Sequence, residues 1–167
     1  MRRKDTSDIG RQAEDLASNL LVQRGFNVRN LNDKRANYPL YDLVAEREGN
    51  ETLISVKCAR AKRELRLGGP NRLEQLSDEC VVMAFIPFTK GQDISFGEGG
   101  YQLLIIPGCI ARDEALAAHH HYAKFHPGST NHSVMVKDKV DRNPTTRSGA
   151  VFSQWLEKYT DAWDVFV

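Results

Sequence analysis

The chain has 167 residues, of which 41% are hydrophobic and 27% are charged, and its formal net charge is +1. This length allows one domain with its own hydrophobic core, whereas the near-neutral charge excludes binding of nucleic acid through a global positive field. Three widely spaced cysteines exclude a disulfide or zinc framework. No apolar run is long enough to cross a bilayer. We therefore expect a cytoplasmic protein.

The first predicted element is a helix over residues 8–24. Apolar residues recur there at helical spacing from Ile9 to Leu21, and Gly25 follows as a residue suited to end the helix. Glu14 lies just off this apolar stripe. It is either a solvated glutamate, which is the commonest fate of that residue, or a functional carboxylate beside the elements that follow.

Three strands are predicted next from apolar and β-branched residues and a turn signal, at residues 26–31, 40–46 and 52–59, with the turn at Gly49-Asn50. Side chains alternate between the two faces of a strand, so Ser55 and Lys57 project from the same face. If the last two strands pair as a hairpin, Asp42 lies beside both. The sequence therefore predicts a carboxylate, a hydroxyl and an amine at one spot on a sheet.

The segment 60–72 is strongly basic and is predicted to be a loop, broken by Gly68-Gly69-Pro70. The remaining predicted elements are a short helix over 71–79, strands at 81–87 and 101–106, a helix at 111–125, a short strand at 133–137 and a last helix from Ser148. We expect a single domain, with its core at residues 8–107 and a C-terminal helical extension over 108–167.

A helix carrying Glu14, a hairpin carrying Asp42 and a strand ending in Ser55-Val56-Lys57 together resemble the PD-(D/E)xK nuclease superfamily. The likeness covers residues 8–107 and is strongest to the archaeal Holliday-junction-resolvase and restriction-endonuclease-like branches. Its matching positions are Gly10, Glu14, Leu20, Gly25-Phe26, Tyr41-Asp42-Leu43-Val44 and Val56-Lys57. The resemblance implies an α/β fold with an αβββαβ core, a mixed central sheet flanked by helices, and a Mg²⁺-dependent endonuclease that hydrolyses the phosphodiester bonds of DNA.

The resemblance also implies roles for three of these residues. Asp42 and Glu14 would hold Mg²⁺ or Mn²⁺, because magnesium prefers oxygen ligands and needs only one or two carboxylates beside the substrate phosphate. Such an ion stabilises charge on the phosphoryl oxygens and generates a hydroxide nucleophile. Lys57 would orient or help to deprotonate the attacking water and offset transition-state charge.

Ser55 departs from the superfamily pattern, which has an acid or sometimes glutamine at this position. In one explanation the missing carboxylate has moved onto the following segment, where Glu74 is the first candidate, Glu79 the second and Glu64 the third. In the other, the site has lost its activity, and the protein binds nucleic acid or a protein partner without cutting. Both explanations stay open on the sequence.

For each residue alone, a structural role is the simpler interpretation: Asp42 is then a paired surface acid, and Lys57 a charge that protects an edge strand from aggregation. Five basic side chains after the hairpin are candidate phosphate contacts on DNA: Arg60, Lys62, Arg63, Arg66 and Arg72. A solvated loop is the alternative for this basic run.

Two further patterns favour structure over chemistry. Consecutive histidines on a helix, His119-His120-His121, point in three directions, so a solvated patch is favoured over a metal site. The last helix carries an aromatic stripe that favours packing, in the core or at a protein contact, over a platform on which nucleic-acid bases stack: Phe152, Trp155, Tyr159 and Trp163. A homodimer is compatible with cutting both strands of DNA, but no residue demonstrates one.

Overall fold

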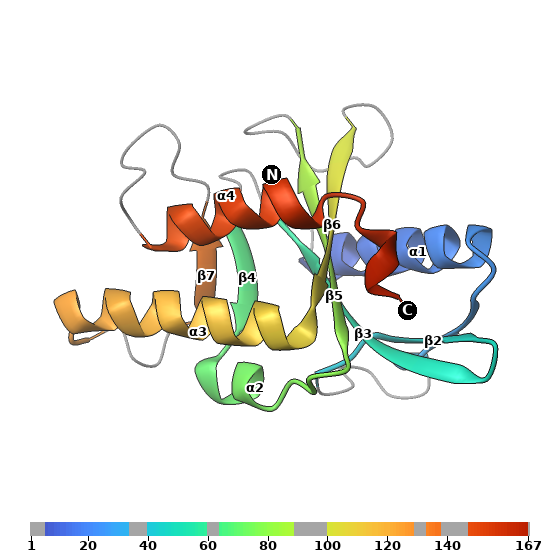
Figure 1. The fold of residues 1–167 in the computed structure, drawn as a ribbon, viewed down its shortest axis with the longest axis horizontal. Helices are drawn as coiled ribbons and strands as arrows, with labels where there is room; N and C mark the ends of the chain where they lie inside the picture. The colour runs from blue at the N-terminus through green and yellow to red at the C-terminus, as the bar shows by residue number, and fades with distance from the viewer. Residues whose placement is uncertain are drawn as a thin grey trace.

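The computed structural model describes residues 6–33, 40–59, 64–88, 100–128, 133–137 and 147–166 (Figure 1). Its helices are α1 (Thr6–Gln23), α2 (Pro70–Glu74), α3 (Gly108–Phe125) and α4 (Arg147–Tyr159), with a 3-10 helix η1 (Trp163–Val165). Its strands are β1 (Asn27–Asn30), β2 (Leu43–Arg47), β3 (Asn50–Cys58), β4 (Glu64–Gly68), β5 (Val81–Pro87), β6 (Tyr101–Pro107) and β7 (Val134–Lys137).

A five-stranded sheet with the order β1-β2-β3-β5-β6 forms the centre of the fold. Its neighbouring strands are antiparallel except for β3 and β5, which are parallel, so the sheet is mixed. The β2–β3 hairpin turns at Glu48 and Gly49, whose φ angles of 54° and 82° suit a type I′ turn. This tight turn fixes the register of the two strands on which the candidate site is built.

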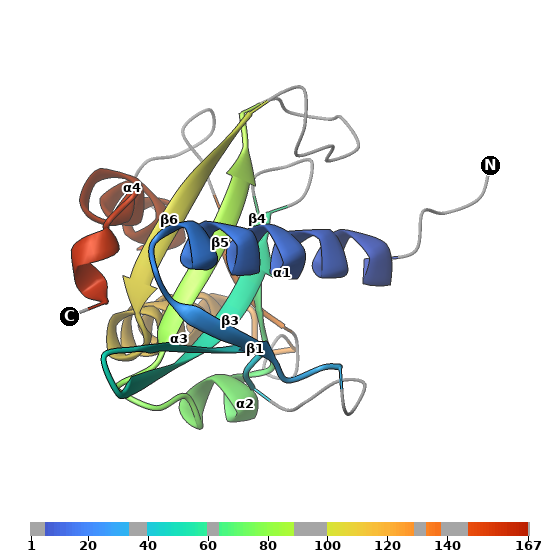
Figure 2. The ribbon, with the colours of Figure 1, turned by 90° about the vertical axis from the view of Figure 1, so that its right-hand side faces the viewer.

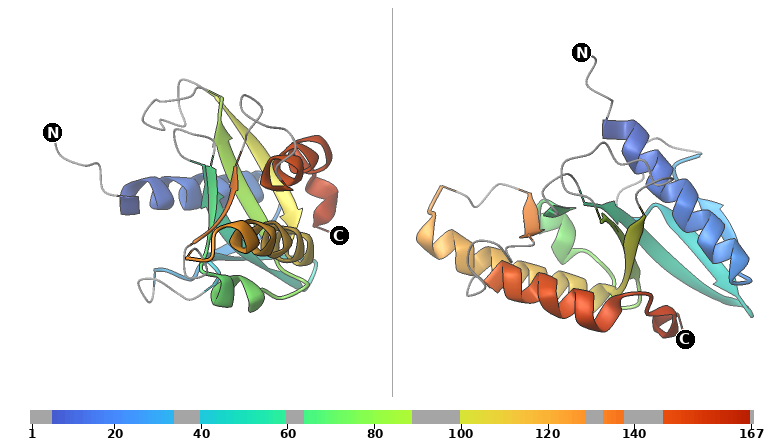
Figure 3. Two further views of the ribbon diagram at one scale, coloured as in Figure 1. Left: turned by 90° about the vertical axis from the view of Figure 1, so that its left-hand side faces the viewer. Right: turned by 90° about the horizontal axis from the view of Figure 1, so that it is seen from above.

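The two faces of the central sheet are covered by different elements. Helix α1 packs on one face, whereas α3, α4 and the two-stranded β4–β7 sheet lie on the other (Figure 1 and Figure 3). Figure 2 shows α1 running across the strands. Ala17 and Leu21 of α1 join Ile54 in one core cluster, and Leu65 joins Trp155 in the second. The predicted fold class, a mixed α/β fold with a central sheet flanked by helices, is therefore confirmed.

The segment 64–68 is a strand, so the prediction of a continuous basic loop over 60–72 is wrong. Leu65 and Leu67 are buried whereas Arg66 is exposed, which is the alternation of a half-buried strand. Antiparallel pairing with β7 satisfies its backbone groups. This alternation of apolar and charged residues covers only five positions within a basic segment, so it was not recognised as a strand from the sequence.

Helix α2 is shorter than the predicted helix over 71–79. It begins at Pro70, a favoured first helical residue because it needs no hydrogen-bond acceptor for an N–H. Leu73 and Leu76 face the core as predicted, although Leu76 lies beyond the last helical residue. The last helix was predicted to run as far as Trp163, but α4 ends at Tyr159 and Trp163 lies in the separate 3-10 helix η1. The remaining predicted elements agree with the structure to within three residues at each end.

The aromatic residues of the C-terminal segment pack inside the protein. Phe152 and Trp155 of α4 are fully buried, and Tyr159 packs against the same core cluster. Trp163 stacks with Phe166 and lies under the guanidinium of Arg24. These contacts favour the core-packing interpretation and leave Phe152 and Trp155 unavailable to a protein partner. Within the described ranges, no helix has the length and apolar character needed to span a membrane.

Candidate functional site

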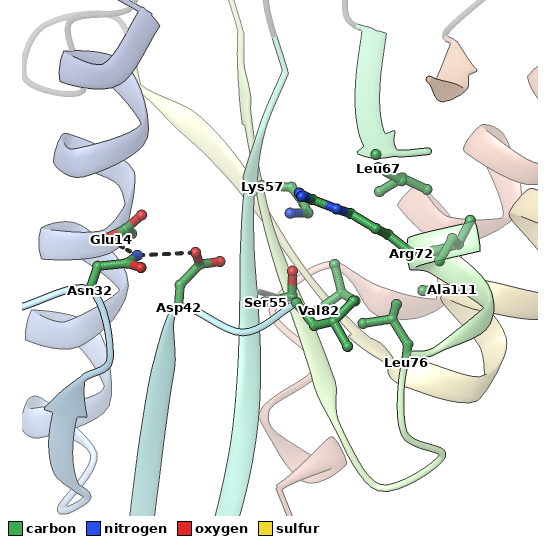
Figure 4. A pocket seen from close by; sticks show the side chains of 13 residues that line it. Glu14, Asn32, Asp42, Ser55, Lys57, Leu67, Arg72, Leu76, Val82 and Ala111 are labelled. Atoms are coloured by element: carbon green, nitrogen blue, oxygen red, sulfur yellow. Dashed lines mark hydrogen bonds between the residues drawn. The ribbon is translucent and has the colours of Figure 1, made fainter. Parts of the chain in front are cut away.

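An open pocket of about 230 Å³ lies where α1, the β2–β3 hairpin, α2 and α3 meet (Figure 4). Its polar lining consists of Glu14, Asn32, Asp42, Ser55, Lys57 and Arg72. Its remaining lining is apolar or backbone and consists of Leu40, Leu67, Gly68, Leu73, Leu76, Val82 and Ala111. The structure thus gathers four residues that the sequence singled out around the hairpin: Glu14, Asp42, Ser55 and Lys57.

Asp42 immediately precedes β2 and is fixed by its neighbours on both sides. Its backbone N–H donates to the carbonyl of Ile54 over 2.8 Å, and its own carbonyl accepts from the N–H of Leu31 over 2.9 Å. One carboxylate oxygen, Oδ2, accepts a 2.7 Å hydrogen bond from the N–H of Val56. The position of the carboxylate is therefore set by backbone hydrogen bonds to the residue after β1 and to the C-terminal half of β3.

The amide of Asn32 connects this carboxylate to the one on α1. Its Nδ2 donates to Oε2 of Glu14 over 3.2 Å and to Oδ1 of Asp42 over 3.4 Å (Figure 4). Asn32 is itself held by its backbone N–H, which donates to Oδ1 of Asn30 over 2.8 Å, as in an Asx turn. Asn32 was not predicted from the sequence, because a single asparagine in a polar segment has no distinguishing pattern.

Burial and the neighbouring charge of Asp42 both act on the carboxyl of Glu14. Burial raises the pKa of the Glu14 carboxyl above its ordinary value of 4.5, the hydrogen bond from Asn32 partly lowers it, and the charge of Asp42 raises it further. Two carboxylates in a partly buried space repel each other unless a cation lies between them. Binding of a cation at this point would therefore favour the ionised form of Glu14.

Ser55 and Lys57 project from β3 into the same pocket, as the alternation of side chains predicts. Ser55 is only 1% exposed, and its hydroxyl has no hydrogen-bond partner among the described residues. A buried hydroxyl without a partner is costly, so it favours a ligand that accepts or donates a hydrogen bond there. Lys57 is half-buried and points into the pocket on the far side of β3 from Asp42 (Figure 4).

Arg72 reaches the pocket from α2. At the end of β4, Gly68 has a φ angle of 99°, a conformation that glycine adopts most readily, and α2 begins two residues later at Pro70. The guanidinium of Arg72 points toward the same part of the pocket as the amine of Lys57 (Figure 4). Neither cation has a carboxylate partner among the described residues, so an anion bound between them would relieve their repulsion.

The three acids that were candidates to replace a carboxylate at position 55 do not line the pocket. Glu74 and Glu79 are exposed, and Glu64 lies 3.4 Å from the Nζ of Lys137. Within the part of the chain that the structure describes, Glu14 is therefore the carboxylate that shares this pocket with Asp42.

The basic candidates are distributed between the pocket and the surface. Arg72 lines the pocket, and Arg66 is exposed on β4. The other three, Arg60, Lys62 and Arg63, lie outside the described residues.

The histidines of α3 lie apart from this pocket. His119 is buried, whereas His120 and His121 are exposed, as expected for consecutive residues that point in different directions. Among the residues placed by the structure, no group of three or more histidine, cysteine, aspartate or glutamate side chains is arranged to hold a metal ion. Any cation at the pocket would depend on Glu14 and Asp42 together with other oxygen donors.

Comparisons with known proteins give little guidance. No protein-family model matches the chain, and no curated protein matches it. Among solved structures, the chain is similar to a bacterial homing endonuclease, I-Ssp6803I, with 17% sequence identity and a TM-score of 0.47, covering 97% of this chain and 92% of that chain. At that degree of similarity the match carries no functional inference, so function has to be inferred from the residues of the pocket.

Proposed function

We propose that the protein is a Mg²⁺-dependent endonuclease that hydrolyses phosphodiester bonds of DNA at this pocket. The observation that carries the proposal is the separation of charge across β3: Glu14 and Asp42 lie on one side, and Lys57 and Arg72 lie on the other. A phosphodiester between them would meet a carboxylate-bound cation on one side and two cationic side chains on the other. The resemblance to PD-(D/E)xK nucleases implies the same division of roles.

The donor set fits a hard divalent cation. Glu14 and Asp42 supply charged oxygen atoms, which Mg²⁺ and Mn²⁺ both accept. Burial and, to a lesser degree, the charge of Asp42 raise the pKa of the Glu14 carboxyl, so a cation bound between the two carboxylates would favour the ionised form of Glu14. When bound there, Mg²⁺ would neutralise charge on the phosphoryl oxygens and lower the pKa of a bound water.

The cationic side of the pocket would act on the phosphate itself. The ammonium of Lys57 can donate to a phosphoryl oxygen or to the attacking water and hold it in line with the phosphorus atom. The planar guanidinium of Arg72 suits bidentate binding of phosphate. From the floor of the pocket, the hydroxyl of Ser55 can donate one further hydrogen bond. All three groups would stabilise the negative charge that grows as the P–O bond breaks.

A nucleic acid is the phosphodiester that best fits the surroundings of the pocket. Arg66 is exposed on β4, the strand that leads through Gly68 into α2 and Arg72. Arg72 at the pocket would contact a phosphate of the DNA backbone and release a counterion, whereas Arg66 projects from the other face of β4 than Leu67, which lines the pocket. Such contacts position a duplex without reading its sequence.

The test is incubation of the purified protein with plasmid, linear and branched DNA in Mg²⁺, in Mn²⁺ and in EDTA. Wild-type protein is compared with Lys57→Ala and with Lys158→Ala, which removes the same charge from an exposed position on α4. We expect cleavage that requires the metal, is lost in Lys57→Ala and persists in Lys158→Ala. Equal cleavage by Lys57→Ala and wild type would contradict the assignment of the site.

One observation favours a second function. Ser55 brings no charge to the pocket, and only two carboxylates line it in the described part of the chain. With so few metal ligands, the protein would bind DNA through Lys57 and Arg72 without cutting it. In the same experiment this function would give salt-sensitive DNA binding, weakened by Arg72→Ala, and no cleavage of any substrate in either metal.

A further inference from the structure

We propose that Asn32 supplies a third oxygen ligand to the cation site. Without an ion, the nitrogen of its side-chain amide faces the carboxylates. When an ion binds, the amide turns over so that its oxygen faces the ion. This inference rests on the proposed function, because it assumes that Glu14 and Asp42 hold a divalent cation. It assigns a cation-binding role to a residue in the turn after β1, which no sequence motif indicated.

The first support is the position of the amide nitrogen. Nδ2 of Asn32 is within hydrogen-bonding reach of one oxygen from Glu14 and one from Asp42, at 3.2 and 3.4 Å. A cation shared by the two carboxylates would lie between these two oxygens and the amide group. The –NH₂ group, with its partial positive charge, therefore acts as a neutral substitute for the ion.

The second support is the chemistry of the amide group. Carboxylates accept hydrogen bonds and do not donate them when ionised, so without a cation the nitrogen of Asn32 must face them. With a cation present the preference reverses, because the amide oxygen is a ligand for hard divalent ions and the –NH₂ group is not. Half a turn about the terminal bond of the side chain exchanges the two atoms without moving the backbone.

The third support is that β3 supplies no charged oxygen ligand to the pocket. Ser55 provides a neutral hydroxyl where a carboxylate would give a further charged oxygen. Asn32 approaches from the opposite direction, at the start of the β1–β2 connection, and its backbone N–H is anchored to Asn30 over 2.8 Å. A fixed backbone with a rotatable amide is suited to deliver one more oxygen to the same ion.

The test measures Mn²⁺ binding by titration calorimetry, together with thermal unfolding in EDTA and in Mn²⁺. Asn32→Leu keeps the approximate shape and removes both polar atoms, whereas Asn32→Asp places oxygen at both positions. Asn27→Leu is the matched control, since Asn27 is an exposed asparagine at the start of β1, the strand that leads into the turn carrying Asn32. Asp42→Asn establishes whether the measured ion binds at this pocket.

We expect Asn32→Leu to lower the Mn²⁺ affinity by about tenfold or more, in the range found for residues that support metal ligands. Asn32→Asp should bind Mn²⁺ more tightly than wild type, yet unfold at a lower temperature in EDTA, because three carboxylates then repel one another. Asn27→Leu should leave Mn²⁺ affinity unchanged.

The outcomes separate this inference from the proposed function. If wild type binds Mn²⁺ through Asp42 and cuts DNA, but Asn32→Leu binds the ion as tightly as wild type or more tightly, Asn32 only bridges the carboxylates and the inference is overturned. The proposed function would then stand. If wild type binds no Mn²⁺, or binds it equally after Asp42→Asn, both the proposed function and the inference are overturned.

Discussion

Oδ2 of Asp42 accepts a 2.7 Å hydrogen bond from the backbone N–H of Val56, the residue between Ser55 and Lys57 on β3. Through this bond, the carboxylate on one side of the pocket is positioned by the strand that carries the amine on the other. The hairpin therefore fixes the separation between the proposed ion and the proposed phosphate contacts. Without this hydrogen bond, the carboxylate of Asp42 would keep its charge but lose its fixed orientation.

Asp42→Asn removes the negative charge while keeping an oxygen that can accept from Val56. We expect the metal-dependent cleavage rate to fall more than about 100-fold, because a direct ligand is worth at least as much as the groups that support it. The free energy of unfolding should change little, since the hydrogen bond is retained. Rates are measured on supercoiled plasmid at saturating Mg²⁺, and unfolding is measured in urea.

The matched control is Asp15→Asn, which changes an exposed aspartate on α1 beside Glu14. It should cleave DNA at close to the wild-type rate. A similar loss in both variants would mean that net charge, rather than ligation by Asp42, controls the rate.

The raised pKa of Glu14 predicts how stability depends on pH without metal. The folded chain binds this proton more tightly than the unfolded chain does. The associated stabilisation is therefore fully present below the ordinary pKa of 4.5 and is lost as the pH rises through the higher folded-state pKa. Glu14→Gln cannot ionise, so in EDTA it should gain stability relative to wild type as the pH rises from about 4 toward 8.

Urea unfolding in EDTA across this pH range checks the sign. Glu157→Gln makes the same chemical change at an exposed position on α4 and serves as the control. Addition of Mn²⁺ at neutral pH should stabilise wild type more than Glu14→Gln, because the ion favours the ionised carboxylate. A stability difference that does not vary with pH would contradict the electrostatic account of Glu14.

Arg72→Gln should weaken DNA binding uniformly across sequences. If the guanidinium contacts one phosphate, the slope of log affinity against log salt concentration becomes shallower by about 0.9 for a duplex. Lys158→Gln removes one charge from α4 and should leave the slope unchanged. Fluorescence anisotropy at several salt concentrations, in EDTA so that no DNA is cut, gives both slopes. Equal slopes for Arg72→Gln and wild type would mean that Arg72 does not contact a DNA phosphate.

The sequence predicted the hairpin half of the candidate site because local rules determine it. Alternation of side chains put Ser55 and Lys57 on one face, and a short turn fixed Asp42 beside them. Glu14 lies just off a clear apolar stripe on α1, and it became a candidate ligand through the resemblance to PD-(D/E)xK nucleases. These three segments are close in sequence, and each has a strong periodic pattern.

The rest of the site depends on contacts that no local pattern encodes. Asn32 matters because α1 and the start of β2 both approach it, which a polar turn does not reveal. Arg72 enters the pocket because β4 pairs with β7, some seventy residues away in the chain, and thereby positions α2. Pairing between distant strands is set by the whole packed structure, so the segment 60–72 could be predicted only from its charge and its Gly-Gly-Pro break.

Two glycines on different elements should respond oppositely to alanine. At Gly108 a Cβ atom would lie 2.2 Å from Sγ of Cys80 and 2.8 Å from the carbonyl oxygens of Cys80 and Ser77. Two of these neighbours are backbone atoms, so Gly108→Ala should destabilise the fold by about 1–3 kcal/mol or more through overpacking. At Gly10 in α1 nothing lies within 4 Å, and alanine should stabilise the helix by about 0.5–1 kcal/mol.

Urea unfolding of both variants compares the two effects in the same protein. Gly10 serves as the control for the alanine substitution itself. Stabilisation by Gly108→Ala would show that α3 does not begin in contact with the segment that precedes β5.

Substitution of Trp155 distinguishes a core role for the aromatic residues of α4 from a role in a contact between proteins. Its side chain is fully buried, and its indole N–H donates to the carboxylate of Glu114 on α3. Trp155→Ala should therefore lower the free energy of unfolding by about 3–5 kcal/mol, as expected when a large buried aromatic is removed. Trp155→Phe keeps most of the volume and should cost clearly less.

Sedimentation velocity separates this interpretation from a role in association. A core residue affects stability at every protein concentration, so the sedimentation coefficient of folded Trp155→Phe should equal that of wild type. Glu114→Gln retains an acceptor for the indole N–H and should be milder than Trp155→Ala. A change of oligomeric state in Trp155→Phe without loss of stability would instead place α4 at an interface between chains.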